Sequence, residues 1–143
     1  MDRYALVHDW LTRQLPGRTF SLSPASADAS FRRYFRVTLP DATLIVMDAP
    51  PEHEDCRPFV HVAGLMSAAG LNVPAILAQD LAQGFLLLSD LGSTTYLAAL
   101  NDHNADSLFG DAIDALIRWQ LASREGVLPP YDEALLRREL DLF

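Results

Sequence analysis

The sequence contains no lysine, a single cysteine and no long hydrophobic run, and each absence narrows what the protein can be. Because Cys56 is the only cysteine, no disulfide can form within the chain. No apolar stretch approaches the roughly 20 residues that a membrane-spanning helix requires, and the first ten residues lack the apolar core of a secretory signal. We therefore expect a cytoplasmic protein with no membrane partner.

Positive charge is scarce and is carried by arginine alone. The chain has 11 basic residues against 19 acidic ones, which gives a formal net charge of -8. Binding to a nucleic-acid backbone requires a positive face, so we expect no nucleic-acid partner. The net charge is still compatible with binding of a small anionic ligand, because several arginines cluster locally. With 143 residues, half of them apolar, the chain is long enough for a core of its own.

Hydrophobic spacing predicts a change of architecture along the chain. A helix, three strands, a second helix and a hairpin of two strands come first, and only helices follow. The expected segments are a helix over 2–15, strands over 19–24, 30–39 and 43–48, a helix between Pro58 and Gly70, a hairpin over 73–92 that turns at 82–84, and helices over 93–100, 106–123 and 131–143. This order predicts an α+β fold in two parts, residues 1–89 and 90–143, joined at Ser89 to Gly92.

Two apolar stripes predict which faces are buried. In the strand over 30–39, alternation places four side chains on one face: Phe31, Phe35, Val37 and Leu39. In the helix over 106–123, helical spacing turns six side chains inward: Leu108, Phe109, Ala112, Ile113, Leu116 and Ile117.

Five strings in this order resemble the N-terminal half of the aminoglycoside-phosphotransferase-like family, whose fold is protein-kinase-like. They are "SADASFRRYFRV", "LIVMDAPPE", "GLNVPAIL", "GFLLLSDLG" and the final "RRELDLF". Within that family the strings are most similar to bacterial kinases that phosphorylate the anomeric hydroxyl of N-acetylmuramate and N-acetylglucosamine. The resemblance implies a five-stranded antiparallel N-lobe with one helix, followed by the first helices of a helical C-lobe. It also implies ATP with Mg²⁺ as the donor and an amino sugar as the acceptor.

The same resemblance implies where the nucleotide would lie. The turn that contains Ser26, Asp28 and Ser30 would cover the phosphates, although it holds no glycine and its carboxylate would repel them unless a cation intervened. The backbone carbonyl of Ser89 and the backbone N–H of Leu91 would reach the edge of the adenine.

One departure from the kinase pattern concerns the cation that holds the phosphates. Kinases use a lysine on the third strand for this purpose, but Met47 stands at the matching position. The side chains of Arg32 and Arg33, on the neighbouring strand, are expected to point to opposite faces of the sheet. Whichever of them faces the cleft could supply the charge, and the sequence leaves that choice open.

The catalytic residues of a phosphoryl-transfer enzyme are not apparent in this chain. A kinase needs an H-x-D string followed five residues later by asparagine, and an aspartate for magnesium. His53 and Asp55 have the first spacing, but the later position is Val60 and the string precedes the joint. We therefore expect the catalytic loop beyond Phe143 and no turnover by these residues alone.

Three alternatives accompany this interpretation. Four residues of types that bind zinc fall within nine positions, although the spacing lacks a defined second pair: His53, Asp55, Cys56 and His61. The missing lysine also fits a non-catalytic domain of kinase-like fold that binds a nucleotide or a protein. Finally, apolar faces of the last helices could promote self-association.

Overall fold

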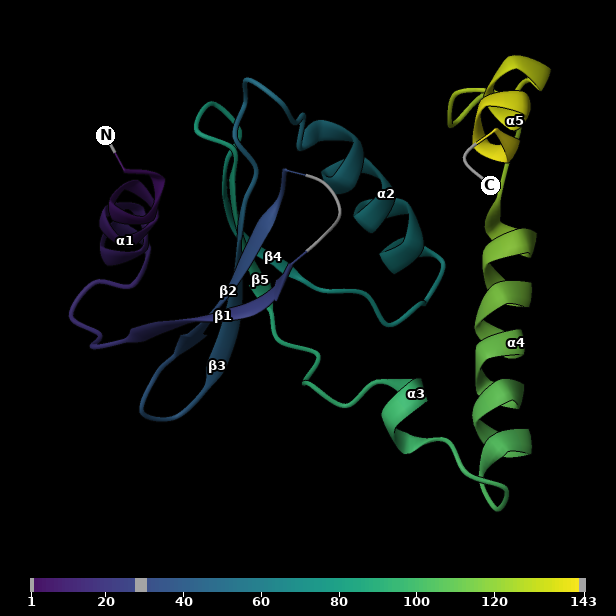
Figure 1. Ribbon diagram of the computed structural model, residues 1–143, viewed down its shortest axis with the longest axis horizontal. Helices are drawn as coiled ribbons and strands as arrows, with labels where there is room; N and C mark the ends of the chain where they lie inside the picture. Colours follow the sequence, from purple (N-terminus) through teal and green to yellow (C-terminus); the bar gives the residue numbers. More distant parts are fainter. Residues whose placement is uncertain (1, 28–30, 142–143) are drawn as a thin grey trace.

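The computed structural model describes residues 2–27 and 31–141, and its centre is one antiparallel sheet of five strands in the order β1-β2-β3-β5-β4 (Figure 1). The predicted change from a sheet to helices occurs after β5. The elements are α1 (Arg3–Gln14), β1 (Ser21–Ala27), β2 (Arg33–Thr38), β3 (Thr43–Asp48), α2 (Arg57–Ala68), β4 (Ile76–Asp80), β5 (Phe85–Ser89), α3 (Tyr96–Ala99), α4 (Ala105–Ala122) and α5 (Glu133–Leu140).

Helix α1 covers one face of the sheet. Asp2 caps the helix by accepting a hydrogen bond from the backbone N–H of Tyr4, and the chain leaves the helix before Pro16. The buried side chains of this face come from the helix and from alternate positions of the central strands: Val7, Trp10, Leu11, Val37, Val46, Phe85 and Leu87. The ring centroids of Trp10 and Phe85 lie 5.6 Å apart. Burial of this apolar surface fixes α1 on the sheet.

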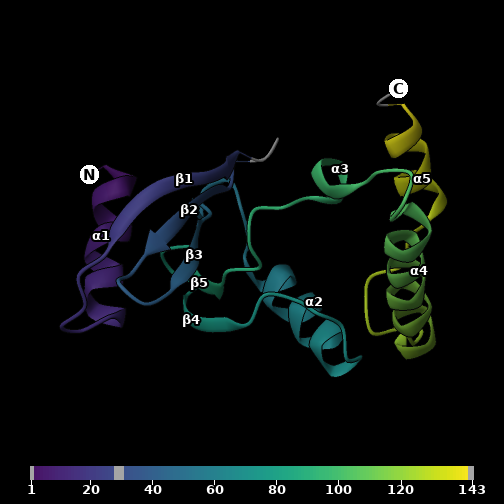
Figure 2. The same cartoon turned by 90° about the horizontal axis from the view of Figure 1, so that it is seen from below.

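Helix α2 lies on the opposite side of the sheet from α1 (Figure 2). Here the buried side chains are Met47, Ala49, Cys56, Leu86 and Leu88, with Tyr34, Ile45, Phe59, Val60 and Ile76 packed around them. Consecutive residues of β5 therefore alternate between two apolar layers. This explains why its sequence is a continuous apolar run, since both faces of the strand are covered.

Gly84 makes the predicted turn between β4 and β5 possible. Its φ of 74° lies in the left-handed region, and its carbonyl accepts a hydrogen bond of 2.8 Å from the N–H of Ala49. A Cβ atom at this position would lie 1.8 Å from the carbonyl oxygen of Ala49. Only glycine allows the turn to approach the end of β3 so closely.

Two expected faces differ from the structure. Phe31 precedes β2, has 62% of its side chain exposed, and stacks on His53 with 4.4 Å between ring centroids, so it does not share the buried face of Val37. Helix α4 is present, but its apolar stripe is exposed rather than inward, as at Phe109 and Ile113. The physical reason is that α4 stands apart from the sheet, and none of its residues is buried (Figure 1).

Candidate functional site

A cleft of about 420 Å³ lies where the α2 side of the sheet meets the segment that leaves β5. We call residues 89–92 the connector, because they join the sheet to the helices. The walls come from six parts of the chain: Ala25 and Ser26, Tyr34 and Arg36, Ile45, Phe59, Pro74, and Leu88 through Thr95. Apolar side chains from β3, β5 and α2 form its floor, which suits the flat face of an aromatic ligand, and polar groups stand at its rim.

The connector is held to β2 by an ion pair. Arg36 donates from Nε to Oδ2 of Asp90 at 2.7 Å and from Nη2 to Oδ1 at 3.3 Å. The N–H of Gly92 donates to the same carboxylate at 2.8 Å. Only 6% of the Asp90 side chain is exposed. The hydrogen bonds from Arg36, with help from Gly92 and the Thr43 hydroxyl, lower the pKa of Asp90 to about 2.

Both predicted adenine-contacting residues line the cleft. Within the described part of the chain, the backbone N–H of Leu91 has no hydrogen-bond acceptor. The Ser89 hydroxyl accepts a bond of 2.8 Å from the N–H of Ala75, so this side chain anchors the segment before β4 and does not serve as a ligand group. A backbone N–H donor beside apolar side chains is compatible with a flat heteroaromatic ligand, and the predicted contact with adenine stays a prediction.

The polar turn after β1 is described only in part. Ser26 lines the cleft, at a place where β1 carries an irregularity in its pairing with β2 between Pro24 and Ser26. Asp28 and Ser30 lie outside the described residues, so their predicted role at the phosphates stays a prediction.

Met47 and Arg33 lie on opposite sides of the sheet. Met47 is fully buried in the layer beneath α2, opposite Tyr34 in the β2–β3 register, so it occupies the face on which the cleft opens. Arg33 instead donates from Nε and Nη2 to Oδ2 of Asp48, at 3.1 and 2.5 Å. Asp48 is fully buried, and its other oxygen accepts two hydrogen bonds from Arg3 of α1. The Arg33 guanidinium thus helps to neutralise a carboxylate on the α1 side.

Arg32 stands one residue before β2, outside the strand pairing, which begins at Arg33. Its charge acts on the Cys56 thiol, which belongs to the layer beneath α2: burial raises the pKa of Cys56, and the positive charge of Arg32 opposes that rise. Arg33 is thus engaged on the α1 side, and a role for Arg32 at the cleft stays a prediction.

The alternative metal site receives no support from the part of the chain that is described. No group of three or more histidine, cysteine, aspartate or glutamate residues there could hold a metal ion. Asp55 is engaged by Arg57, which donates to both of its oxygens and lowers its pKa, while Cys56 is buried. His61 faces another segment, with its Nε2 3.4 Å from the carbonyl oxygen of Val127.

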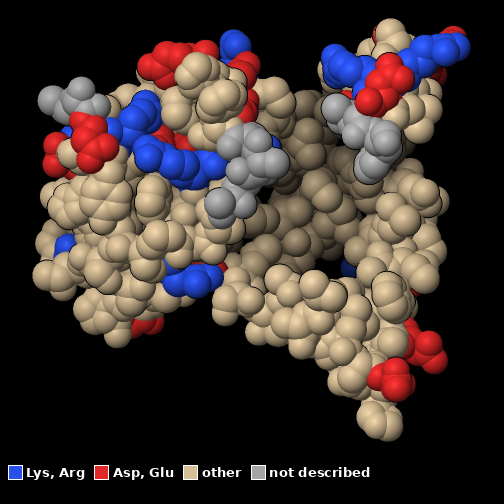
Figure 3. All heavy atoms as spheres, in the orientation of Figure 1, with Lys and Arg blue, Asp and Glu red and all other residues tan. Residues whose placement is uncertain are grey.

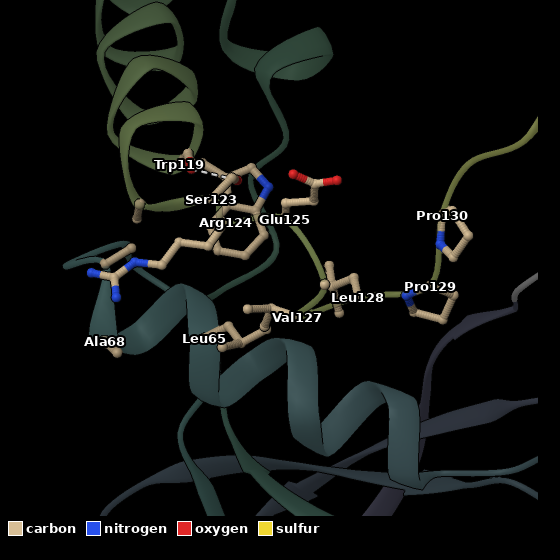
Figure 4. A pocket seen from close by; sticks show the side chains of 13 residues that line it. Leu65, Ala68, Trp119, Ser123, Arg124, Glu125, Val127, Leu128, Pro129 and Pro130 are labelled. Carbon is tan, nitrogen blue, oxygen red and sulfur yellow. Dashed lines mark hydrogen bonds between the residues drawn. The ribbon is translucent and has the colours of Figure 1, made fainter.

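A second, larger hollow of about 770 Å³ lies between α2 and the loop after α4. Figure 4 shows Leu65 and Ala68 of α2 facing Trp119 at the end of α4, with Val127 of the loop near Leu65. The hollow is mainly apolar and carries no cluster of charged side chains. In the space-filling view, the molecule is deeply hollowed between the sheet and the helical part (Figure 3). The lining of this second hollow suits packing against apolar groups better than catalysis.

Sequence reasoning missed the two ion-pair clusters. Alternation along β2 does place Arg36 on the cleft side, but its partner Asp90 is 54 residues away. Likewise Asp48 lies 45 residues from Arg3 and 15 from Arg33. Pairs at such separations leave no periodic signal in one sequence.

The fold and the cleft define the class of the protein. A five-stranded antiparallel sheet, a helix after the third strand and a connector that leads into helices form a kinase-like N-lobe followed by the first helices of a C-lobe. The sequence profile described as the phosphotransferase enzyme family matches residues 21–143. The chain therefore belongs to that family.

Three similar curated proteins narrow the comparison, and each is named N-acetylmuramate/N-acetylglucosamine kinase. The Pseudomonas aeruginosa protein is 66% identical over 85% of this chain and 36% of its own length. The Pseudomonas putida protein is 56% identical over 86% of the chain and 36% of its own length. The Neisseria meningitidis protein is 43% identical over 100% of the chain and 44% of its own length. The chain thus spans less than half of the relatives it matches. No described helix could cross a membrane.

Proposed function

We propose that this chain is the nucleotide-binding portion of an ATP-dependent sugar kinase. The acceptor would be the anomeric hydroxyl of N-acetylmuramate or N-acetylglucosamine. The observation that carries the proposal is the 66% identity to a kinase named for these two sugars, over 85% of the chain. The cleft beside the connector supports it, because an apolar floor and the N–H of Leu91 fit a nucleobase.

In this proposal adenine lies on the floor formed by Ile45 and Leu88, with its edge at Ser89 and Leu91. The phosphates extend toward the turn that begins at Ser26. ATP would bring Mg²⁺ with it, and the described residues contain no cluster that could hold the ion. We propose that its protein ligands and the catalytic base lie in the part of the relatives that this chain does not span.

The proposal assigns the phosphate-binding charge to Arg32 rather than to a strand lysine. A guanidinium presents two parallel N–H donors to phosphate oxygens, so it can replace an ammonium without identical geometry. Arg32→Met should weaken ATP binding by the complete natural protein about tenfold, the value of one charge-assisted contact, and leave adenosine binding unchanged. Arg18→Met, at an exposed pair with Asp41, is the matched control and should change neither. Equal affinity for ATP in Arg32→Met would remove Arg32 from the site.

The direct test of function uses the complete natural protein that carries this chain. It should transfer the γ-phosphoryl group of ATP to N-acetylmuramate and N-acetylglucosamine, and the product should carry the phosphate on the anomeric carbon, as ³¹P and ¹³C spectra would show. Glucose serves as a control acceptor without the acetamido group. Absence of any ATP-dependent sugar phosphate would refute the proposal.

Met47 at the lysine position favours one rival, a kinase-like domain that binds without transferring phosphate. Thermal denaturation of the same protein with saturating ATP and Mg²⁺ separates the two. A rise in melting temperature without sugar phosphate would favour a binding domain, and no rise at all would favour a protein-interaction domain.

A further inference from the structure

A connector of this kind could in general adopt many conformations, but here the buried carboxylate of Asp90 determines its path. Asp90 is the second of the four connector residues, and its side chain turns back toward the sheet and away from solvent, with 6% exposed. It accepts hydrogen bonds from Arg36 of β2 and from the N–H of Gly92, and the Thr43 hydroxyl at the start of β3 also contributes to lowering its pKa. Three separate parts of the chain therefore converge on one side chain.

These contacts fix the peptide groups on either side of Leu91. The Gly92 N–H is only one residue beyond the Leu91 N–H, and its bond to Asp90 closes a two-residue turn around Leu91. Gly92 has a φ of 93°, and its carbonyl lies 3.4 Å from Nη2 of Arg36. The direction of the Leu91 N–H follows from this turn.

From this arrangement we propose that Arg36 and Asp90 are positioning residues for the nucleobase: the ion pair aligns the connector so that the Leu91 N–H points at the ligand in the cleft. The inference rests on the proposed function, since it assumes a nucleoside in this cleft. Neither side chain needs to touch the nucleobase. Preorganised donors bind more tightly because the ligand does not have to order them.

The bidentate geometry explains why an arginine serves here. A guanidinium holds the carboxylate by two donors and so restricts its rotation, whereas a single ammonium contact would leave the carboxylate free to turn. Arg36→Lys should therefore restore only part of the alignment that Arg36→Met removes.

The experiment measures adenosine and tripolyphosphate binding by calorimetry with the complete natural protein. Adenosine reports the nucleobase end of the cleft, and tripolyphosphate reports the phosphate end. Asp90→Asn and Arg36→Met should each weaken adenosine binding about tenfold, with Arg36→Lys intermediate, and leave tripolyphosphate affinity unchanged. The KM for ATP should rise by a similar factor while kcat falls less than twofold.

Asp41→Asn, at the exposed Arg18–Asp41 pair, is the control and should bind adenosine like the wild type. If the pair were merely structural, the variants would lower the melting temperature while the folded protein kept its adenosine affinity, and the inference would be overturned. If the wild type itself binds neither adenosine nor ATP, the proposed function fails first, which distinguishes the two failures.

Discussion

At the scale of single residues, Asp48 joins several elements on the α1 side of the sheet. A fully buried carboxylate is tolerated because Arg3 and Arg33 donate four hydrogen bonds to it, two to each oxygen. Arg3 also donates to the carbonyl of Gln83 at 2.7 Å, which connects α1 to the turn before β5. The cluster thus links the N-terminal helix, two central strands and a hairpin turn.

Asp48→Ala should lower the free energy of unfolding by about 1.5–3 kcal/mol, because it removes hydrogen bonds to two charged groups that are themselves partly exposed to solvent. Arg33→Met should cost less, since Arg3 still neutralises the carboxylate. Urea denaturation followed by circular dichroism measures both. Glu133→Ala, which removes an exposed pair with Arg137, should change the free energy by less than about 1 kcal/mol. A small effect of Asp48→Ala would contradict the structural role of the cluster.

Asp90 also makes stability depend on pH. Its folded-state pKa of about 2 lies below its ordinary 3.8, so the unfolded chain binds the proton first as the pH falls. The stabilisation is therefore fully present above about pH 4 and is lost as the pH drops toward 2.

The difference in unfolding free energy between the wild type and Asp90→Asn should therefore shrink between pH 4 and pH 2. Comparing the two proteins cancels the contributions of other carboxylates, such as Asp55 and Asp80, whose pKa values are also lowered. A difference in unfolding free energy that stays constant between pH 4 and pH 2 would show that its partners do not lower the pKa of Asp90.

At the scale of elements, the β4–β5 turn joins the sheet to the loop after β3. Gly84 has a positive φ and also lies against the backbone of Ala49, whereas Gly70, at the end of α2, has a positive φ but open space around it. Comparing substitutions at the two glycines therefore separates the cost of a left-handed backbone from the cost of a steric clash.

Gly70→Ala should cost about 1–2 kcal/mol, the strain of a left-handed alanine. Gly84→Ala should cost clearly more, because the new Cβ would lie 1.8 Å from a backbone oxygen and the turn must move. Thermal unfolding of the two variants provides the comparison. Equal losses would mean that the turn shifts freely and that the contact with Ala49 is unimportant.

The elements themselves were largely predictable. Apolar spacing anticipated α1 through Val7, Trp10 and Leu11, because a helix packed on a sheet must bury one stripe. The hairpin over 73–92 was also predicted, with its turn at 82–84, and the structure has β4 and β5 joined there through Gly84. Phe31 was assigned to the wrong environment, because alternation cannot show where a strand begins, and the chain pairs only from Arg33.

At the scale of the whole molecule, the helical part is attached to the sheet by the connector and leaves a broad apolar surface. Five large apolar side chains of α4 are about half exposed or more: Phe109, Ile113, Leu116, Ile117 and Leu121. Such a stripe on a helix is usually covered by another element or another molecule.

We expect purified residues 1–143 to self-associate at micromolar concentration and to phosphorylate no sugar. Ile113→Glu, in the middle of the exposed stripe, should shift the chain toward the monomer in sedimentation velocity, since burying a carboxylate in an apolar contact is costly. Gln120→Glu, at an exposed polar position of the same helix, adds the same negative charge and controls for charge alone. A monomeric wild-type chain, or measurable turnover free of host kinase, would contradict these expectations.

The sequence by itself determined the order of helices and strands, the break at the connector, and the absence of a strand lysine. These depend on local spacing and residue type, which a single chain displays. Only the tertiary structure decided that Arg33 neutralises Asp48 on one side of the sheet while Arg36 holds Asp90 on the other. Those outcomes depend on which distant residues folding brings together, and ion pairs leave no periodic trace along the chain.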